Sequence, residues 1–199
     1  MVVESILQLL YSDPSFKILA CTPSNAAADL LVERLAAAGL DEDQLFRLNA
    51  YSRYEDDIPE DVQAYSEYKK PKLLTVRVVL STCSSAGFLQ TENVPAGHFS
   101  HIIIDEAAQA EEPLALIPIA AFTNENTNVI LAGDPHQLGP VIKSSPASNS
   151  GLGKSFIERL MLISNIYGLE TQVGKTLVMS LTSLNKVCQL WCLGSSIFN

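Results

Sequence analysis

Two short apolar runs that end abruptly in acidic and amide side chains place the strongest constraint on how this chain folds. The runs cover residues 102–104 and 130–132. The polar residues that follow are, after the first run, Asp105, Glu106 and Gln109 and, after the second, Gly133, Asp134 and Gln137. Such unbroken apolar runs are typical of strands buried on both faces of a parallel sheet. Because open α/β sheets bind ligands at the carboxyl ends of their strands, these polar residues mark a candidate site.

Helical and strand spacings of apolar residues alternate through the first half of the chain. This alternation predicts an α/β fold with a mostly parallel sheet flanked by helices. We expect helices over residues 2–10 and 26–38 and strands over 17–21, 45–48 and 73–81. Ser24 or Asn25 is the expected N-cap of the second helix, and Gly39 is its expected end.

The second half contains two further predicted helices. Glu111-Glu112-Pro113 opens the first, which Pro118 should shorten or kink. A capping box at residues 155–158 begins the second, which should end near Gly168. Residues 143–153 are rich in Ser, Pro and Gly and predict a loop. Residues 41–71, outside the strand at 45–48, predict a mobile surface connection, and 170–199 predict a poorly specified tail because neither segment has a clear period.

Composition bounds the class of protein. The chain has 199 residues, a suitable length for one domain, and 47% of them are hydrophobic. With 13 basic and 22 acidic residues the net charge is -9, and no basic cluster occurs. Bulk attraction to nucleic acid or to an anionic membrane is therefore not expected, and we expect any contact with nucleic acid to come from individual loops. No apolar stretch approaches the length of a membrane span.

The four cysteines and three histidines do not show the spacing of zinc ligands, so we predict no metal site built from them. His101 opens a buried strand and is interpreted as structural. Four cysteines in a chain without a signal peptide indicate a reducing, intracellular setting.

The pair Asp105 and Glu106 suits phosphoryl transfer, in which a protein mainly positions groups and balances charge. One carboxylate can hold Mg²⁺ through water, while its neighbour orients or deprotonates the attacking water. Gln137 could then contact the terminal phosphate. An acidic pair after a strand is also explained by solvated charges, and it is Gln109 and the 133–140 segment that favour the functional interpretation.

Three segments, at residues 22–29, 105–109 and 133–140, resemble the ordered motifs of superfamily 1 RNA helicases. Residues 76–87 and 151–168 look closest to the group of plant silencing-defective helicases and animal Moloney-leukaemia-virus-10 proteins. The resemblance covers about residues 1–168. It implies an incomplete RecA-like P-loop NTPase domain, the first of two in an ATP-dependent motor on single-stranded RNA, followed by an atypical tail at 169–199.

The resemblance also implies roles for individual residues. Asp105 would bind Mg²⁺ through water, Glu106 would be the general base and Gln137 would sense the γ-phosphate. Gln109, Gly133 and Asp134 would complete the ATP side of the site. The residues that would meet the RNA backbone are Pro23, Ser24, Asn25, Thr82 and Ser84. Short hydroxyls and amides bond phosphate and sugar without reading sequence, although for Ser24 and Asn25 a helix cap is the alternative explanation.

Further implications concern partners and location. The resemblance implies single-stranded RNA and RNA-silencing or ribonucleoprotein proteins as partners, no membrane, and a cytoplasmic location that includes ribonucleoprotein granules.

The sequence departs from the family pattern in two places. The resemblance implies a phosphate-binding loop ending in Gly-Lys-Thr or Gly-Lys-Ser before the first helix, yet the chain starts at Met1-Val2-Val3-Glu4. Gly174-Lys175-Thr176 lacks the preceding strand and the first glycine of such a loop. No arginine follows Arg159, so no arginine finger is expected. We therefore expect impaired catalysis and an internal piece of a helicase, as from altered splicing or an imperfect gene model.

Three functional readings stay open at this point. The chain is a motor fragment with little or no activity alone, or a non-catalytic RNA- or protein-binding module that competes with the intact helicase. The third is a product without independent function, whose tail prevents stable folding.

Overall fold

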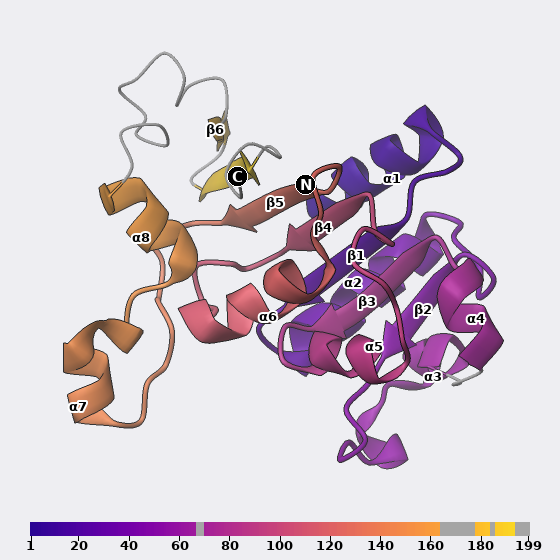
Figure 1. Ribbon diagram of the computed structural model, residues 1–199, viewed down its shortest axis with the longest axis horizontal. Coiled ribbons are helices and arrows are strands. Elements are labelled where there is room, and N and C mark those ends of the chain that lie inside the picture. Colours follow the sequence, from indigo (N-terminus) through magenta and orange to yellow (C-terminus); the bar gives the residue numbers. More distant parts are fainter. Residues whose placement is uncertain (67–69, 164–177, 184–185, 194–199) are drawn as a thin grey trace.

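A twisted sheet with helices on both faces forms the body of the computed structural model (Figure 1). The structure describes residues 1–66, 70–163, 178–183 and 186–193. In the described part of the chain the sheet has the strand order β2-β3-β1-β4-β5-β7-β6. Three predictions fall outside the described residues. They are the end of the last helix near Gly168, the Gly174-Lys175-Thr176 segment and the domain boundary between residues 168 and 169.

Five parallel strands occupy the part of the sheet where the sequence predicted it. They are β1 (Ile18–Thr22), β2 (Leu45–Leu48), β3 (Val78–Thr82), β4 (His101–Ile104) and β5 (Asn128–Gly133). All residues of the first four are buried, which explains their mostly apolar character; the charged exception is Arg47 in β2. The predicted strands at 17–21 and 45–48 are confirmed within a residue.

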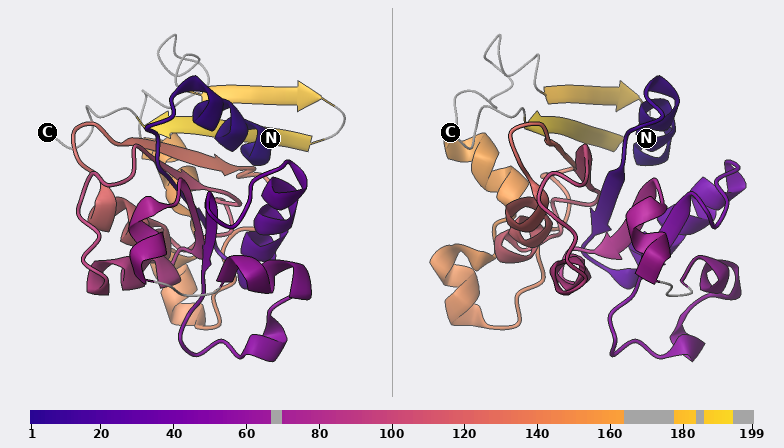
Figure 2. Two further views of the ribbon diagram at one scale, coloured as in Figure 1. Left: turned by 90° about the vertical axis from the view of Figure 1, so that its right-hand side faces the viewer. Right: turned by 45° about the vertical axis from the view of Figure 1, so that its right-hand side comes forward.

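Helices cover both faces of this sheet (Figure 2), and a cluster of buried hydrophobic residues lies on each face. On one face lie α1 (Val2–Ser12), α2 (Asn25–Ala37) and α3 (Glu60–Ser66). The helices with residues in the layer on the opposite face are α4 (Lys70–Thr75), α5 (Phe88–Thr91), α6 (Glu112–Phe122) and α8 (Phe156–Ile163). Neighbouring residues along each strand contribute to opposite layers, as Leu19 and Ala20 do in β1. This three-layer arrangement is the RecA-like α/β fold that the sequence predicted.

Chain order and spatial order differ in a way that locates a crevice. After β1 the chain passes outward to β2 and returns through β3, whereas β4 and β5 lie on the other side of β1. The direction of winding therefore reverses between β1 and β4. In open α/β sheets, ligands bind at this switch point, beyond the carboxyl ends of the strands.

Local signals set the helix ends as expected. The Ser24 hydroxyl accepts a hydrogen bond from the Ala27 amide at 3.3 Å, so Ser24 is the N-cap of α2. Gly39, at φ 101°, follows the C-cap of that helix in the left-handed conformation that glycine adopts without strain. Ser155 caps α8 by accepting from the Glu158 amide at 3.3 Å. Arg159 also anchors α8 to α6 through an ion pair with Glu112.

Outside β2, residues 41–71, which the sequence predicted to be a mobile surface connection without a clear period, contain helical elements that were not expected. This segment contains the 3-10 turn η1 (Glu55–Asp57), α3 and the start of α4. The strand expected over 73–81 begins only at Val78, because α4 continues to Thr75. Val62 of α3 and Leu73 of α4 are almost fully buried, so contacts with the sheet, which local periodicity does not reveal, stabilise these short helices.

Three expectations for the second half also differ from the structure. The α6 helix passes through Pro118 and continues to Phe122, so the proline does not shorten it. Residues 143–153 contain α7 (Ser145–Ala147) and the π-helical turn η3 (Ser148–Leu152) instead of an irregular loop. Within the segment read as a poorly specified tail, β6 (Val178–Ser183) and β7 (Lys186–Leu193) pair with each other, and β7 extends the sheet antiparallel to β5 (Figure 2).

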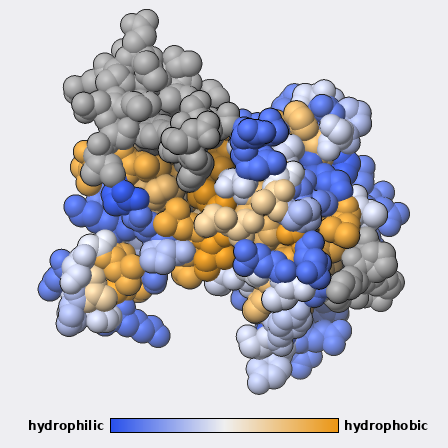
Figure 3. Space-filling view, viewed as in Figure 1, coloured by the Kyte–Doolittle hydropathy of each residue, from blue (hydrophilic) through white to orange (hydrophobic). Residues whose placement is uncertain are grey.

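Surface character varies across the face seen in Figure 1. Apolar residues gather in the middle of this face, over α6 and the adjoining part of α8 (Figure 3). Among the described helices, none combines the length and the apolar character that a bilayer span requires.

Candidate functional site

The polar residues singled out in the sequence lie in a fixed order along the carboxyl edge of the sheet. Because β3, β1, β4 and β5 are neighbours in that order, the segments that leave them are neighbours too. Hydrogen bonds join these segments: the Cys83 amide donates to the Thr22 carbonyl and the Asp105 amide to the Cys21 carbonyl, both at 2.8 Å. The predicted RNA contacts thus follow β3 and β1, and the predicted ATP contacts follow β4 and β5.

Asp105, Glu106 and Gln109 form one hydrogen-bonded group beyond β4. Asp105 Oδ1 accepts from the Glu106 amide at 3.0 Å, and Glu106 Oε2 accepts from Gln109 Nε2 at 2.9 Å. Glu106 has φ 54°, a left-handed conformation that is uncommon outside glycine and asparagine. Such backbone strain, of the order of 1–3 kcal/mol, is concentrated at functional sites.

Burial decides the electrostatics of Asp105. Removal from water disfavours the charged carboxylate and raises its pKa, and the nearby Glu106 charge raises it further. The hydrogen bond from the Glu106 amide and the positive charges of the Met1 amino group and Arg34 lower the pKa but do not offset burial. A bound cation would favour the charged form.

Gly133, Asp134 and Gln137 have different structural tasks beyond β5. Gly133 is buried against the backbone of Ala107 and Ala108, so it permits close packing of two loops. Asp134 accepts from the His136 amide at 2.9 Å and from Gln137 Nε2 at 3.0 Å. Asp134 therefore orients the exposed Gln137 side chain, and a direct contact of either residue with ATP stays a prediction.

Two adjoining pockets connect the segments at the switch point. One, of about 400 Å³, is lined by Pro23, Ser24, Gln109 and Leu138, among others. The second, of about 500 Å³, is lined by Gln109, His136, Gln137 and Leu138. Gln109 and Leu138 line both pockets, so the pocket that touches Pro23 and Ser24 lies next to the one that touches Gln137.

The remaining predicted RNA contacts, Thr82, Ser84 and Asn25, differ in their exposure and in their hydrogen bonds. Thr82 is only 6% exposed, and its hydroxyl donates to Ser85 Oγ at 2.8 Å, so it holds the turn after β3. Ser84 is exposed beside it, with the two hydroxyl oxygens 3.2 Å apart. Asn25 is exposed at the start of α2, and its Oδ1 accepts from Arg47 Nη2 at 2.9 Å.

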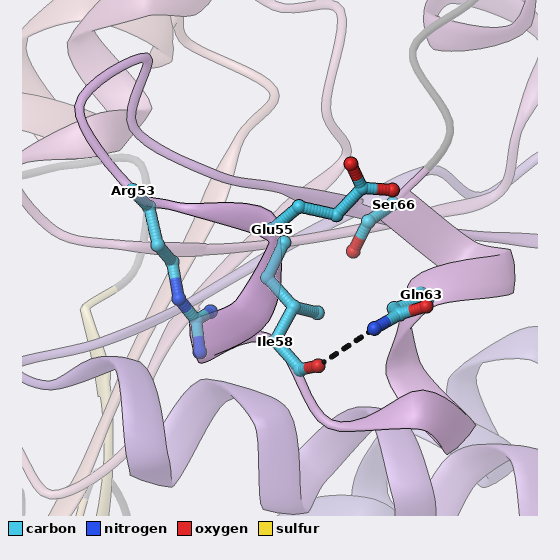
Figure 4. Close-up of a pocket in the computed structure, with 5 residues that line it drawn as sticks. All are labelled: Arg53, Glu55, Ile58, Gln63 and Ser66. Carbon is cyan, nitrogen blue, oxygen red and sulfur yellow. Dashed lines mark hydrogen bonds between the residues drawn. The ribbon is translucent and has the colours of Figure 1, made fainter.

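A buried ionic cluster next to Asn25 was missed in the sequence. Arg47 is fully buried, and its Nε donates to Asp29 Oδ1 at 2.9 Å. Arg53 Nη2 donates to the second carboxylate oxygen of Asp29, Oδ2, at 2.6 Å. Charged residues inside the apolar patterns of β2 and α2 were the available signal. Arg53 also lines a separate cavity of about 260 Å³, together with Glu55, Ile58, Gln63 and Ser66 (Figure 4).

The donor set at β4 fits Mg²⁺ that is held jointly with a substrate. Among the described residues, no group of three His, Cys, Asp or Glu side chains could enclose a metal ion. Mg²⁺ usually keeps several waters and binds one or two carboxylates together with substrate phosphates. Asp105, a partly buried carboxylate whose charge is disfavoured by burial, suits that mode.

Comparison with known proteins identifies relatives of this chain. A family model described as an AAA domain matches residues 63–145. RNA helicase Mov10l1 from Homo sapiens is 42% identical over 163 residues, which are 80% of this chain and 14% of that protein. Putative helicase MOV-10 from Gallus gallus is 39% identical over 183 residues, 83% of this chain and 19% of the relative. Probable RNA helicase armi from Drosophila melanogaster is 34% identical over 185 residues, 80% and 16% respectively.

This chain thus spans between 14% and 19% of the length of these three relatives. The residues matched by the AAA model include both polar segments, after β4 and after β5. The parallel sheet, the order of these segments and the shared sequence agree with one another, and the chain belongs to the Mov10-like group of superfamily 1 helicases.

Proposed function

We propose that this chain carries the ATP-hydrolysing edge and part of the RNA path of an RNA helicase motor, and that alone it turns over ATP poorly or not at all. The observation that carries the proposal is the order of groups along one edge of the sheet. Carboxylates and amides suited to phosphoryl transfer follow β4 and β5, and small polar groups suited to a nucleic acid backbone follow β1 and β3.

On the ATP side, Asp105 would hold Mg²⁺ through water, and Glu106 orients and deprotonates the attacking water. Mg²⁺, when bound, neutralises charge on the phosphates. Gln109 holds the Glu106 carboxylate through its 2.9 Å hydrogen bond, and Asp134 holds Gln137 for contact with the γ-phosphate. Gly133 keeps the two loops in register. Little covalent chemistry is needed from the protein, because positioning and charge supply most of the catalysis of phosphoryl transfer.

On the RNA side, Ser24, Asn25 and Ser84 contact phosphate and sugar, with Pro23 lining the path and Thr82 fixing the turn. These contacts do not read bases, so binding is sequence-independent. With a net charge of -9, the chain gains little from bulk electrostatics and depends on these individual hydrogen bonds.

Nucleotide binding and turnover test the ATP side. The full chain is titrated with a fluorescent ATP analogue with and without Mg²⁺, for wild type, Asp105→Asn and Glu106→Gln. We expect weak, Mg²⁺-dependent binding that Asp105→Asn removes and Glu106→Gln retains. Equal binding by wild type and Asp105→Asn would refute the assignment of Asp105. Rapid turnover that Glu106→Gln abolishes would refute the poor activity while supporting the role of Glu106.

A second candidate function is a non-catalytic module that binds RNA or protein and competes with the intact helicase. The observation that favours it is that Ser24 and Asn25 are held by α2 and Arg47, through contacts that involve no residue of the ATP side. It predicts RNA binding that is unchanged by Mg²⁺-ATP or by Glu106→Gln. For the intact protein, the proposal extends to RNA-silencing or ribonucleoprotein partners in the cytoplasm and its granules, which co-purification from cells would test.

A further inference from the structure

Arg47 makes an unusually complete set of contacts for a charged side chain inside a sheet. It is fully buried in β2, and its three nitrogens all donate. Nε donates to Asp29 Oδ1 at 2.9 Å, Nη1 to the Leu48 carbonyl, and Nη2 to Asn25 Oδ1 at 2.9 Å. Burying a charge is costly unless it is paired and hydrogen-bonded, so Asn25 Oδ1, which accepts from Nη2, is tied to the buried guanidinium although Asn25 itself is exposed.

We infer that Arg47 is a positioning residue that turns the Asn25 amide so that its Nδ2 donor faces a phosphate oxygen of single-stranded RNA. The inference rests on the proposed RNA contact of Asn25 and adds which atom makes it and what holds that atom in place.

The orientation follows from the chemistry of the guanidinium group. Arginine has five donors and no acceptor, so the atom of Asn25 that meets Nη2 at 2.9 Å is the carbonyl oxygen. The Nδ2 group then points away from Arg47, and it donates to no other described residue. Asn25 is exposed, which leaves this N–H₂ free for a ligand. A ligand that meets a donor here must offer an acceptor, as the phosphate oxygens of RNA do.

The charge beneath Asn25 strengthens this donor. Within the described cluster, two guanidinium groups, of Arg47 and Arg53, face one carboxylate, of Asp29. The excess positive charge pulls electron density through the Asn25 carbonyl and polarises its N–H₂ group. In a chain of net charge -9, it also makes this point of the edge favourable for an anion.

Arg53 can be compared with Arg47 because both bond Asp29. It bonds both oxygens of Asp29, at 3.0 and 2.6 Å, and Asn49 Oδ1 at 2.8 Å. It shares the partner Asp29 with Arg47 but does not contact Asn25. A variant of Arg53 therefore disturbs the cluster without releasing the Asn25 amide.

The first experiment is Asn25→Asp in the full chain. Aspartate has the same shape and still accepts from Arg47, but its outward atom is a negatively charged oxygen. We expect unchanged or higher stability in urea, because the cluster becomes neutral, together with a loss of affinity for fluorescein-labelled oligouridine of about tenfold or more. Asn126→Asp is the matched control, since it adds the same charge to an exposed residue before β5, at the opposite edge of the sheet, and should bind like wild type.

The second experiment is a double-mutant cycle. Arg47→Lys keeps a charge for Asp29 but loses the planar fork, and it should weaken oligouridine binding about as much as Asn25→Ala does. The double variant should be no weaker than either single one, because both remove the same contact. Arg53→Lys should lower stability and leave the affinity near that of wild type.

The outcomes separate this inference from the proposed function. If wild type does not bind oligouridine at low salt, the proposed RNA contact fails and the positioning role fails with it. If wild type binds and Asn25→Asp binds equally well, the Asn25 contact and its positioning by Arg47 are overturned, whereas the proposed contacts of Ser24 and Ser84 stand. Additive losses in the cycle, or an equal loss in Arg53→Lys, also overturn it. Should Arg47→Lys not fold, Asn25→Asp against Asn126→Asp decides the question.

Discussion

Gly133 and Ala108 are packed backbone against backbone. A Cβ atom placed on Gly133 would lie 2.9 Å from the Ala108 amide nitrogen and 3.0 Å from that of Ala107. The Ala107 amide also donates to the Ala132 carbonyl at 2.8 Å. The carboxyl end of β5 is therefore packed tightly against the segment after β4, which fixes where the two parts of the ATP side meet.

Gly133→Ala should disrupt this packing. The added methyl group meets backbone atoms that cannot turn away, so we expect a loss of about 1–3 kcal/mol in the free energy of unfolding. Mg²⁺-dependent nucleotide binding should weaken as well. Urea denaturation measures the first effect, and Gly139→Ala is the control, because its Cβ would meet only the Gly153 carbonyl oxygen at 3.4 Å. A Gly133→Ala protein as stable as wild type would contradict the packing described above.

Asp105→Asn should stabilise the chain at neutral pH while it removes Mg²⁺-dependent nucleotide binding. Burial raises the pKa of Asp105 above its ordinary value of 3.8. The folded state therefore holds the proton more tightly than the unfolded state. The stability that this group contributes is present below pH 3.8 and is lost as the pH rises through the raised pKa. Urea denaturation of both proteins over a pH series should show the advantage of the variant growing with pH; a less stable variant at pH 7 would refute it.

Asp29→Asn should lower the stability of the chain at neutral pH, in contrast to Asp105→Asn. Burial alone would raise the pKa of Asp29, but hydrogen bonds from Arg53 and Arg47 and their charges hold it below its usual 3.8. The stability from this carboxylate is present above pH 3.8 and is lost as the pH falls through the lowered pKa. At neutral pH, removal leaves the buried Arg47 without its counter-charge and should cost about 3–5 kcal/mol. The exposed Asp43→Asn is the control, and equal unfolding free energies for the two variants would rule out a structural role for the cluster.

Ser24 can be tested for its two roles separately. Ser24→Ala removes the N-cap of α2 and should cost about 1 kcal/mol of stability. Ser24→Asp keeps a capping oxygen and adds a favourable interaction with the helix dipole, but its charge repels phosphate. The unfolding temperature of Ser24→Asp should therefore be close to that of wild type. The anisotropy of labelled oligouridine at low salt should nevertheless show that this variant binds RNA more weakly than wild type. Unchanged RNA affinity in Ser24→Asp would leave Ser24 as a helix cap alone.

Much of the site could be predicted because its residues follow strands. The apolar runs before Asp105 and Gly133 identified buried parallel strands, and the carboxyl ends of such strands meet at one edge. The N-cap at Ser24 was also predictable, because capping depends only on residues within one helical turn. Short helices such as α3 escaped prediction because packing against the sheet stabilises them.

The sequence by itself determined the five parallel strands and the helices α1, α2, α6 and α8, the edge on which the polar segments meet and the family to which their order points. Only the tertiary structure decided that Arg47 pairs with Asp29 and holds Asn25, that Gly133 touches Ala108, and that β7 pairs with β5. The physical reason is range. Helix caps and strand periods depend on neighbours along the chain, whereas buried ion pairs and backbone contacts join residues that become neighbours only when the sheet assembles.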